Sequence, residues 1–142
     1  MRAKSLTLIY KWKGELCMSN SSNLNYYYKL KEECVTKQNK YKNSLSICNN
    51  LVNELNSFKN SLGNVKDALA VSFTINGKTA DDGVTEQLIE KISNMSSIIS
   101  GQIIPQIQTE ITQLTNKINE YDRQIAYLIK QAQEESKKEN GV

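Results

Sequence analysis

The chain has 142 residues, which is about one domain, and it is 39% hydrophobic and 7% aromatic with a single proline. That composition excludes both a disordered chain and an apolar-rich compact enzyme. The net charge of +3 lies entirely in the first seventeen residues, because 14 basic residues face 14 acidic ones from Met18 onward. A neutral body offers little attraction for phosphates, so we expect no nucleic-acid binding.

Residues 1–17 combine basic residues with a short apolar run from Leu6 to Tyr10. This run is too short for a signal peptide or for a membrane-spanning helix, which needs about 20 apolar residues. Since the periodic pattern begins only after Met18, we interpret residues 1–17 as a disordered extension or a stretch ahead of the true start. We therefore expect no membrane insertion and a cytoplasmic protein.

The next stretch is predicted to be helical, with a capping residue somewhere in Ser19 to Asn23. Apolar residues then recur at steps of three and four, the period of one helix face. These residues are Tyr27, Cys34, Tyr41, Leu45, Cys48, Val52, Leu55, Leu62 and Leu69, with Gln38 and Lys59 as polar interruptions. Further apolar residues widen the stripe and suggest more than one neighbouring helix, namely Leu30, Val35, Ile47, Leu51, Phe58 and Val65.

The segment from Val71 to Lys78 is rich in β-branched residues and contains Asn76-Gly77, a strong turn signal. A second helical stretch is predicted after Asp81-Asp82-Gly83, where acidic residues suit a helix N-terminus. Its first half is Val84, Leu88, Ile92, Met95, Ile99 and Ile103, and its second half is Ile107, Ile111, Leu114, Ile118, Tyr121, Ile125, Leu128 and Ala132. The second half alternates steps of four and three, which is typical of a coiled coil.

Pro105 lies between these halves and removes a backbone donor, so we expect either a kink near Ile103–Ile104 or a break into two helices. Two long helices joined by a short turn predict an all-α, coiled-coil-like antiparallel hairpin over residues 18–135. The arms support this pairing, since residues 24–70 carry a net +3 and residues 71–142 a net −3. Residues 136–142 are predicted to be a frayed tail.

Catalytic chemistry is not indicated. The chain has no histidine for a Ser-His or Cys-His pair and no glycine-rich phosphate loop, so we expect neither an enzyme nor a cofactor. Cys34 and Cys48 would lie about 21 Å apart on one helix, too far for a disulfide. Reduced thiols are the simplest interpretation, with an intermolecular bridge or a zinc site as the alternatives. The run Tyr26-Tyr27-Tyr28 has two interpretations. It could anchor a partner protein, or one of its tyrosines could lie in the seam between the helices with the other two on the flanks.

One motif carries a family resemblance. Residues Ile75-Asn76-Gly77-Lys78-Thr79-Ala80, set between two long amphipathic helices, resemble the W-x-G-x-x-A hairpin pattern of the WXG superfamily, with Ile75 in place of the tryptophan. Together with the start at Met18, the chain resembles the YwqH-like proteins encoded beside LXG toxins in Gram-positive bacteria. The resemblance covers residues 18–135. It implies that Gly77 permits the turn and that Ala80 allows close helix contact.

The resemblance also implies a function, that of a targeting chaperone or adaptor for type VII secretion. The hairpin would bind the helical N-terminal domain of an LXG toxin, with room for a second small helical partner, and could leave the cell with it. The family's export spacing is not present at the C-terminus, where Tyr121 is followed by Ile125. Tyr28 and Glu32 match it near the N-terminus. The alternative is a structural coiled-coil protein that forms a homo-oligomer when alone.

The predicted helix interface uses the regular positions of both stretches. It comprises Tyr41, Leu45, Val52, Leu55, Leu62, Ile111, Leu114, Ile118, Tyr121, Ile125 and Leu128.

Overall fold

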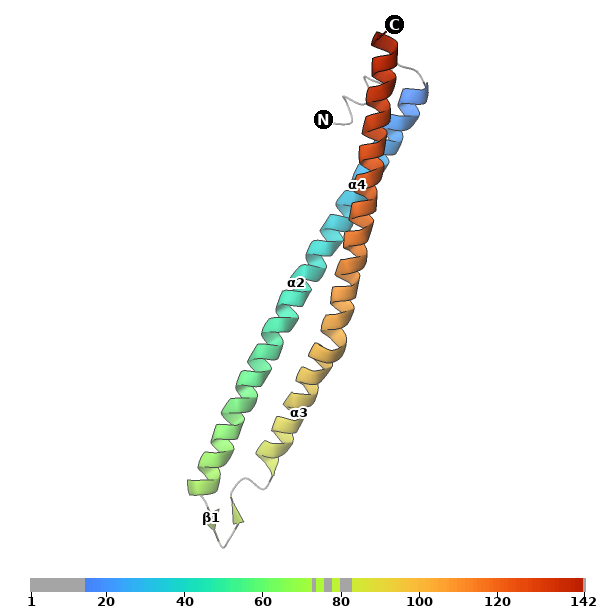
Figure 1. Cartoon of the computed structure of the whole chain (residues 1–142). Coiled ribbons are helices and arrows are strands. Elements are labelled where there is room, and N and C mark those ends of the chain that lie inside the picture. Colours follow the sequence, from blue (N-terminus) through green and yellow to red (C-terminus); the bar gives the residue numbers. More distant parts are fainter. Residues whose placement is uncertain (1–14, 73, 76–77, 80–82, 142) are drawn as a thin grey trace. The chain divides into compact units, whose positions relative to one another are not determined.

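A computed structural model describes residues 15–72, 74–75, 78–79 and 83–141. Helix α2 spans Glu15–Ser72, and strands β1 (Thr74–Ile75) and β2 (Lys78–Thr79) follow it. Helix α3 (Val84–Ile98), the π-helical turn η1 (Ile99–Ile103) and helix α4 (Ile104–Asn140) return the chain (Figure 1). The fold is therefore the all-α helical hairpin that the two periodic stretches predicted.

The first helix begins earlier than predicted. Helix α2 starts at Glu15 and passes through Ser19–Asn23 without a break, so no residue of that run acts as the expected cap. Ser21 is buried rather than placed at a helix end. At the other end of the chain, α4 continues to Asn140, so residues 136–140 of the expected tail are helical.

The tip of the hairpin contains a minimal antiparallel pairing of β1 with β2, with Ile75 opposite Lys78. Helix α3 then starts after Gly83, whose φ of 78° lies in the left-handed region that glycine adopts without strain. The carbonyl of Gly83 accepts a hydrogen bond from the backbone N–H of Gln87 at 3.0 Å, which opens the first helical turn. Asp81 and Asp82, the predicted helix-terminal acids, lie outside the described residues.

The irregularity expected near Pro105 takes the form of a widened turn rather than a break. In η1 the backbone N–H of Ile104 bonds to the carbonyl of Ile99, five residues back, and α4 follows directly with Pro105 as its second residue. The wider turn adds one residue to the helical repeat. As a result Ile104 is partly buried and Ile103 is exposed, which corrects the predicted placement of Ile103 in the seam.

Contacts divide the chain into two units. Unit 1 comprises the described residues up to Lys40 and from Ile111 onward, and unit 2 comprises those from Tyr41 to Glu110. In unit 1, α2 and α4 run antiparallel, as their cross-helix contacts require: Gln38 Nε2 donates to Thr115 Oγ1 at 2.7 Å, and Lys31 pairs with Asp122 at 2.6 Å.

In unit 2, α2 and α3 also run antiparallel. Ser96 Oγ donates to Asn56 Oδ1 at 3.3 Å, and Lys66 pairs with Glu86 at 3.2 Å. In each unit the ion pair joins a lysine of the first arm to a carboxylate of the second, as the opposite charges of the arms predicted. No helix in the described ranges is long and apolar enough to cross a membrane.

Candidate helix-binding surface

The seam between the helices is thin. Among the described residues only five large hydrophobic side chains are buried, and none of them is fully shielded from solvent. They are Ile92, Ile99, Leu114, Ile125 and Leu128. Two helices can cover only one edge of each other, so much of the apolar surface is left without cover.

Every predicted interface residue lies on or beside this seam. Leu114, Ile125 and Leu128 are buried, and the other eight are partly buried, so none of the eleven is exposed. Whether a partner contacts them stays a prediction. Of the predicted hairpin-turn residues, Ile75 lies in β1, whereas Gly77 and Ala80 lie outside the described residues.

Polar residues inside the seam have partners. Gln38, predicted as an interruption of the apolar stripe, is buried and donates to Thr115, whose hydroxyl donates in turn to the Ile111 carbonyl at 2.8 Å. Every buried side-chain nitrogen or oxygen in the described part of the chain has a hydrogen-bond partner. Such a satisfied pair favours one alignment of the helices, because sliding would leave a buried amide unpaired.

The tyrosine cluster belongs to unit 1. Tyr27 lies in the seam with its ring centroid 6.1 Å from that of Tyr121, while Tyr26 is exposed and packs edge-on against Tyr27. Burial raises the pKa of Tyr121 above its ordinary value, and the nearby Cys34, Tyr26, Tyr27 and Glu33 add to the shift. The arrangement matches the simpler of the two sequence interpretations, in which one tyrosine lies in the seam.

The exposed apolar side chains are the feature that the sequence placed incorrectly. Val84, Leu88 and Met95 were predicted to lie in the seam, but all three are exposed. The predictions for Ile92 and for Ile99 of η1 are confirmed, since both are buried, and α3 also turns Thr85, Ile89 and Ser96 inward. Helix α3 carries two apolar stripes one residue apart, and packing against α2 buries the stripe that includes the small side chains Thr85 and Ser96.

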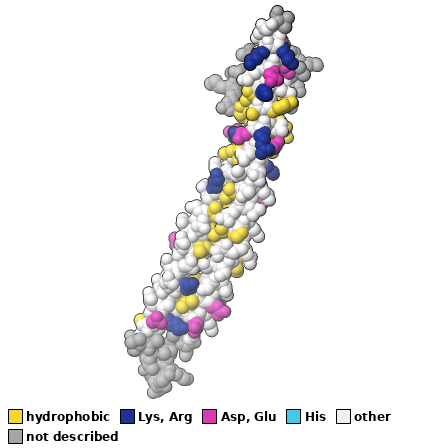
Figure 2. Space-filling view, viewed as in Figure 1, with side chains coloured by type: hydrophobic (Ala, Val, Ile, Leu, Met, Phe, Trp, Pro, Cys, Tyr) yellow, Lys and Arg dark blue, Asp and Glu magenta, His cyan; other side chains and the backbone are white. Residues whose placement is uncertain are grey.

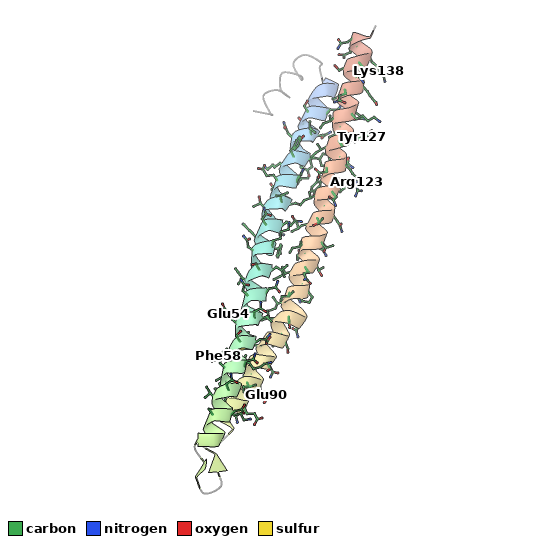
Figure 3. The ribbon with its side chains drawn as sticks, turned by 60° about the vertical axis from the view of Figure 1, so that its left-hand side comes forward. Glu54, Phe58, Glu90, Arg123, Tyr127 and Lys138 are labelled. Carbon is green, nitrogen blue, oxygen red and sulfur yellow. The ribbon has the colours of Figure 1, made fainter. Side chains whose placement is uncertain are left out.

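The exposed stripe on α3 has a counterpart on α2. Four exposed residues of α2 each precede an inward-facing residue by one position, and four of α3 do the same. The α2 residues are Ile47, Leu51, Phe58 and Val65, and the α3 residues are Val84, Leu88, Met95 and Ile98. We call these eight residues the apolar face of unit 2. Figure 3 shows Phe58 and Glu54 along α2 in this unit.

Helix geometry puts the two stripes on one side of unit 2. Each residue turns the helix by about 100°, so a residue one position before the seam points sideways. Because α2 and α3 run in opposite directions, the same sequence offset turns both side chains to the same side. The positions one after the seam, which include Asn53, Asn60, Glu86 and Ser97, point to the opposite side and are polar.

Figure 2 shows one face of the molecule. Over the part formed by α2 and α3, the face it shows carries a narrow band of hydrophobic side chains within a surface that is mostly neither hydrophobic nor charged. Because the exposed residues one position before the seam are apolar and those one position after it are polar, unit 2 is apolar on one side and polar on the other.

The described residues were searched for metal sites, paired cysteines and recesses that could hold a ligand. No group of three or more cysteine, aspartate or glutamate side chains there could hold a metal ion. Cys34 and Cys48 are free, as their separation on one helix requires. An open recess beside η1, lined by Tyr41, Pro105 and Glu110 among others, offers a single carboxylate.

Comparison with known proteins found no matching family model, no matching curated protein and no matching solved structure. The YwqH-like resemblance therefore stays a prediction from the residues that carry it.

Proposed function

We propose that this chain is a non-enzymatic helical adaptor that binds the helical N-terminal domain of an LXG-type toxin and accompanies it to type VII secretion. The observation that carries the proposal is the apolar face of unit 2, which lies on a helical hairpin and is left exposed by the described residues. A helix of a partner could lie along this face and bury it, as amphipathic helices do in apolar grooves.

The composition of the surface supports a protein partner. Exposed apolar surface of this kind marks interaction sites, and burying it contributes about 25 cal/mol per Å². Within the two stripes the charged residues are Glu54 and Lys91, one of each sign. Such a surface suits a helical partner of low charge and offers nothing to an anionic polymer.

Co-expression with the helical N-terminal domain of an LXG-type toxin tests the proposal. We expect the two chains to co-purify and to elute together in size-exclusion chromatography with light scattering. The variant Ile47→Asp with Leu51→Asp should lose the complex, because it puts two carboxylates on the apolar face. The matched control, Asn49→Asp with Asn53→Asp, adds the same charge to the opposite side of the same helix and should retain it.

Two outcomes would overturn the proposal. Absence of any complex, with the chain alone remaining a homo-oligomer, would favour the structural coiled coil. Retention of the complex by both variants would show that the toxin binds elsewhere.

A further inference from the structure

We propose that, in the absence of another partner, the apolar face of unit 2 binds a second copy of this chain and forms a two-fold symmetric, four-helix dimer. This inference does not rest on the proposed function, since the chain alone is sufficient for it. Three properties of the face point to a second copy as its occupant: its area, its charge and the alignment of its two stripes.

The exposed area is that of a dimer interface. Ile47 is 67% exposed, Phe58 55% and Met95 51%, and the other five residues are at least 40% exposed. With whole-residue areas of roughly 170–240 Å², the eight side chains leave on the order of 800 Å² accessible. This accessible area is of the same order as the roughly 800 Å² that each partner contributes to a standard specific interface.

The charge of the face permits self-association. Glu54 precedes the seam residue Leu55, and Lys91 precedes Ile92, so both charged side chains occupy positions within the stripes. One acidic and one basic residue leave the face neutral, and two copies brought together meet no net repulsion. The polar face has an acidic cluster, with Asp67, Glu86 and Glu90 at the end of α2 and the start of α3, and is less suited to pairing with itself.

The alignment of the stripes is self-complementary. Asn56 contacts Ser96 and Lys66 contacts Glu86, and in both pairs the residue numbers add to 152, so residues with that sum lie side by side in unit 2. By this rule Phe58 is level with Met95 to within one residue, and Val65 is level with Leu88.

A two-fold axis parallel to the helices then brings α2 of one copy against α3 of the other. Phe58 of each copy would pack against Met95 of the other, and Val65 against Leu88. At these two levels the bundle receives apolar side chains from all four helices, as in the layered core of a four-helix bundle.

Size-exclusion chromatography with light scattering on the full chain tests the inference. We expect twice the 16.1 kDa mass of one chain at about 100 µM. Phe58→Asp with Met95→Asp should lose the dimer at that concentration, because two carboxylates from each copy would be desolvated at its centre. The matched control is Asn60→Asp with Ser97→Asp, which adds the same charge on the polar face and should stay dimeric.

Circular dichroism separates loss of the dimer from loss of the fold. Both residues of the test variant are more than half exposed, so the helical signal of the hairpin should persist. Should it be lost, Phe58→Ser replaces the test variant, since it removes the central aromatic without adding charge, and it should shift the equilibrium to monomer at least tenfold. A monomeric wild-type chain at about 100 µM, a dimer that survives the apolar-face variants, or a control that dissociates as they do would each overturn the inference.

Discussion

Units 1 and 2 share the same antiparallel helix pairing but differ in the side chains that they expose to solvent. Nine of the twelve exposed large hydrophobic side chains among the described residues lie in unit 2, and three lie in unit 1: Tyr26, Tyr127 and Ile129. In unit 1 the α4 positions that precede the seam are mostly polar, namely Gln113, Lys117, Glu120 and Gln124.

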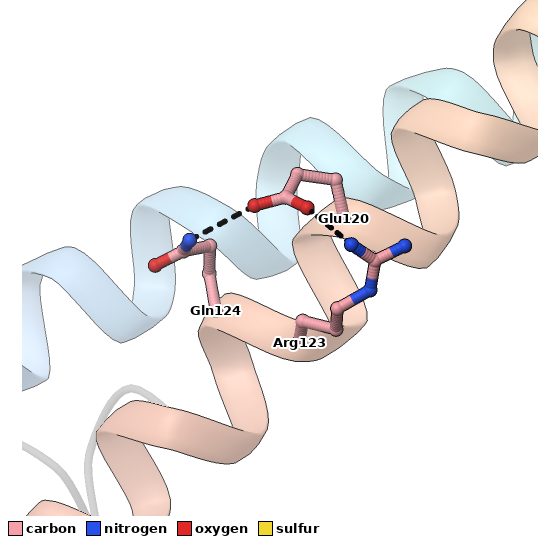
Figure 4. Close-up of polar contacts among 3 residues, drawn as sticks. All are labelled: Glu120, Arg123 and Gln124. Atoms are coloured by element: carbon pink, nitrogen blue, oxygen red, sulfur yellow. Dashed lines mark hydrogen bonds and ion pairs between the residues drawn. The ribbon is translucent and has the colours of Figure 1, made fainter.

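Figure 4 shows polar contacts on α4 of unit 1 that involve two of these residues, Glu120 and Gln124. Glu120 accepts hydrogen bonds from Arg123 and from Gln124, each at 2.9 Å, so its polar groups bond to one another along α4. In unit 2 the equivalent positions hold Val84, Leu88 and Met95. The comparison teaches that the same antiparallel helix pairing can carry a polar outer surface along one segment and an apolar one along another.

The largest expected effect comes from removing a buried side chain of unit 1. Leu114 is 5% exposed, so Leu114→Ala should lower the free energy of unfolding by about 2–4 kcal/mol, through lost burial and the cavity left behind. Thermal unfolding followed by circular dichroism measures this. The paired variant Phe58→Ala, in unit 2, should change the stability of the monomer by less than about 0.5 kcal/mol. Equal losses would contradict the distinction between the units.

A smaller effect is expected from the buried amide of unit 1. Gln38→Ala should destabilise the chain by about 1–2 kcal/mol, because the packing of the buried Gln38 side chain and its hydrogen bond to Thr115 are both lost. Replacing both partners, with Gln38→Leu and Thr115→Val, should restore most of that loss. A double-mutant cycle in urea measures the coupling, and strictly additive losses would show that the hydrogen bond does not matter.

The cross-helix ion pairs should contribute least at neutral pH. Lys31→Gln in unit 1 and Lys66→Gln in unit 2 should each change stability by about 0–1 kcal/mol, since both pairs are partly exposed and screened by salt. Stability measured at low and at high salt should therefore converge for wild type and variants. A loss that persists in high salt would indicate packing by the lysine stems instead.

Ionisation of Tyr121 should affect stability only at alkaline pH. Its pKa is raised in the folded state, chiefly by burial, so the fold favours the neutral phenol. The resulting stabilisation is fully present below the ordinary tyrosine pKa and is lost as pH rises through the raised one. Absorbance titration should show a late-ionising tyrosine in the wild type that is missing in Tyr121→Phe, and identical titration curves would contradict the assignment.

The regular spacing of apolar residues in the second stretch predicted which side of α4 faces α2. From Ile107 to Leu128 the steps of four and three leave one choice of inward face, and each of those residues is at least partly buried. In α3 the prediction failed because two apolar stripes compete. Periodicity predicted Ile92 correctly, but it also predicted Val84, Leu88 and Met95, which are exposed, in place of Thr85 and Ser96, which are buried.

The sequence by itself determined the all-α class, the two arms, their antiparallel pairing and an irregularity near Pro105, because these follow from local periodicity, charge and a missing backbone donor. Only the tertiary structure decided which stripe of α3 faces α2. Rotating a helix with two adjacent apolar stripes by about 100° exchanges them at little local cost. The choice therefore falls to contacts far apart in the sequence, such as Asn56 with Ser96, and to the extra residue that η1 inserts before α4.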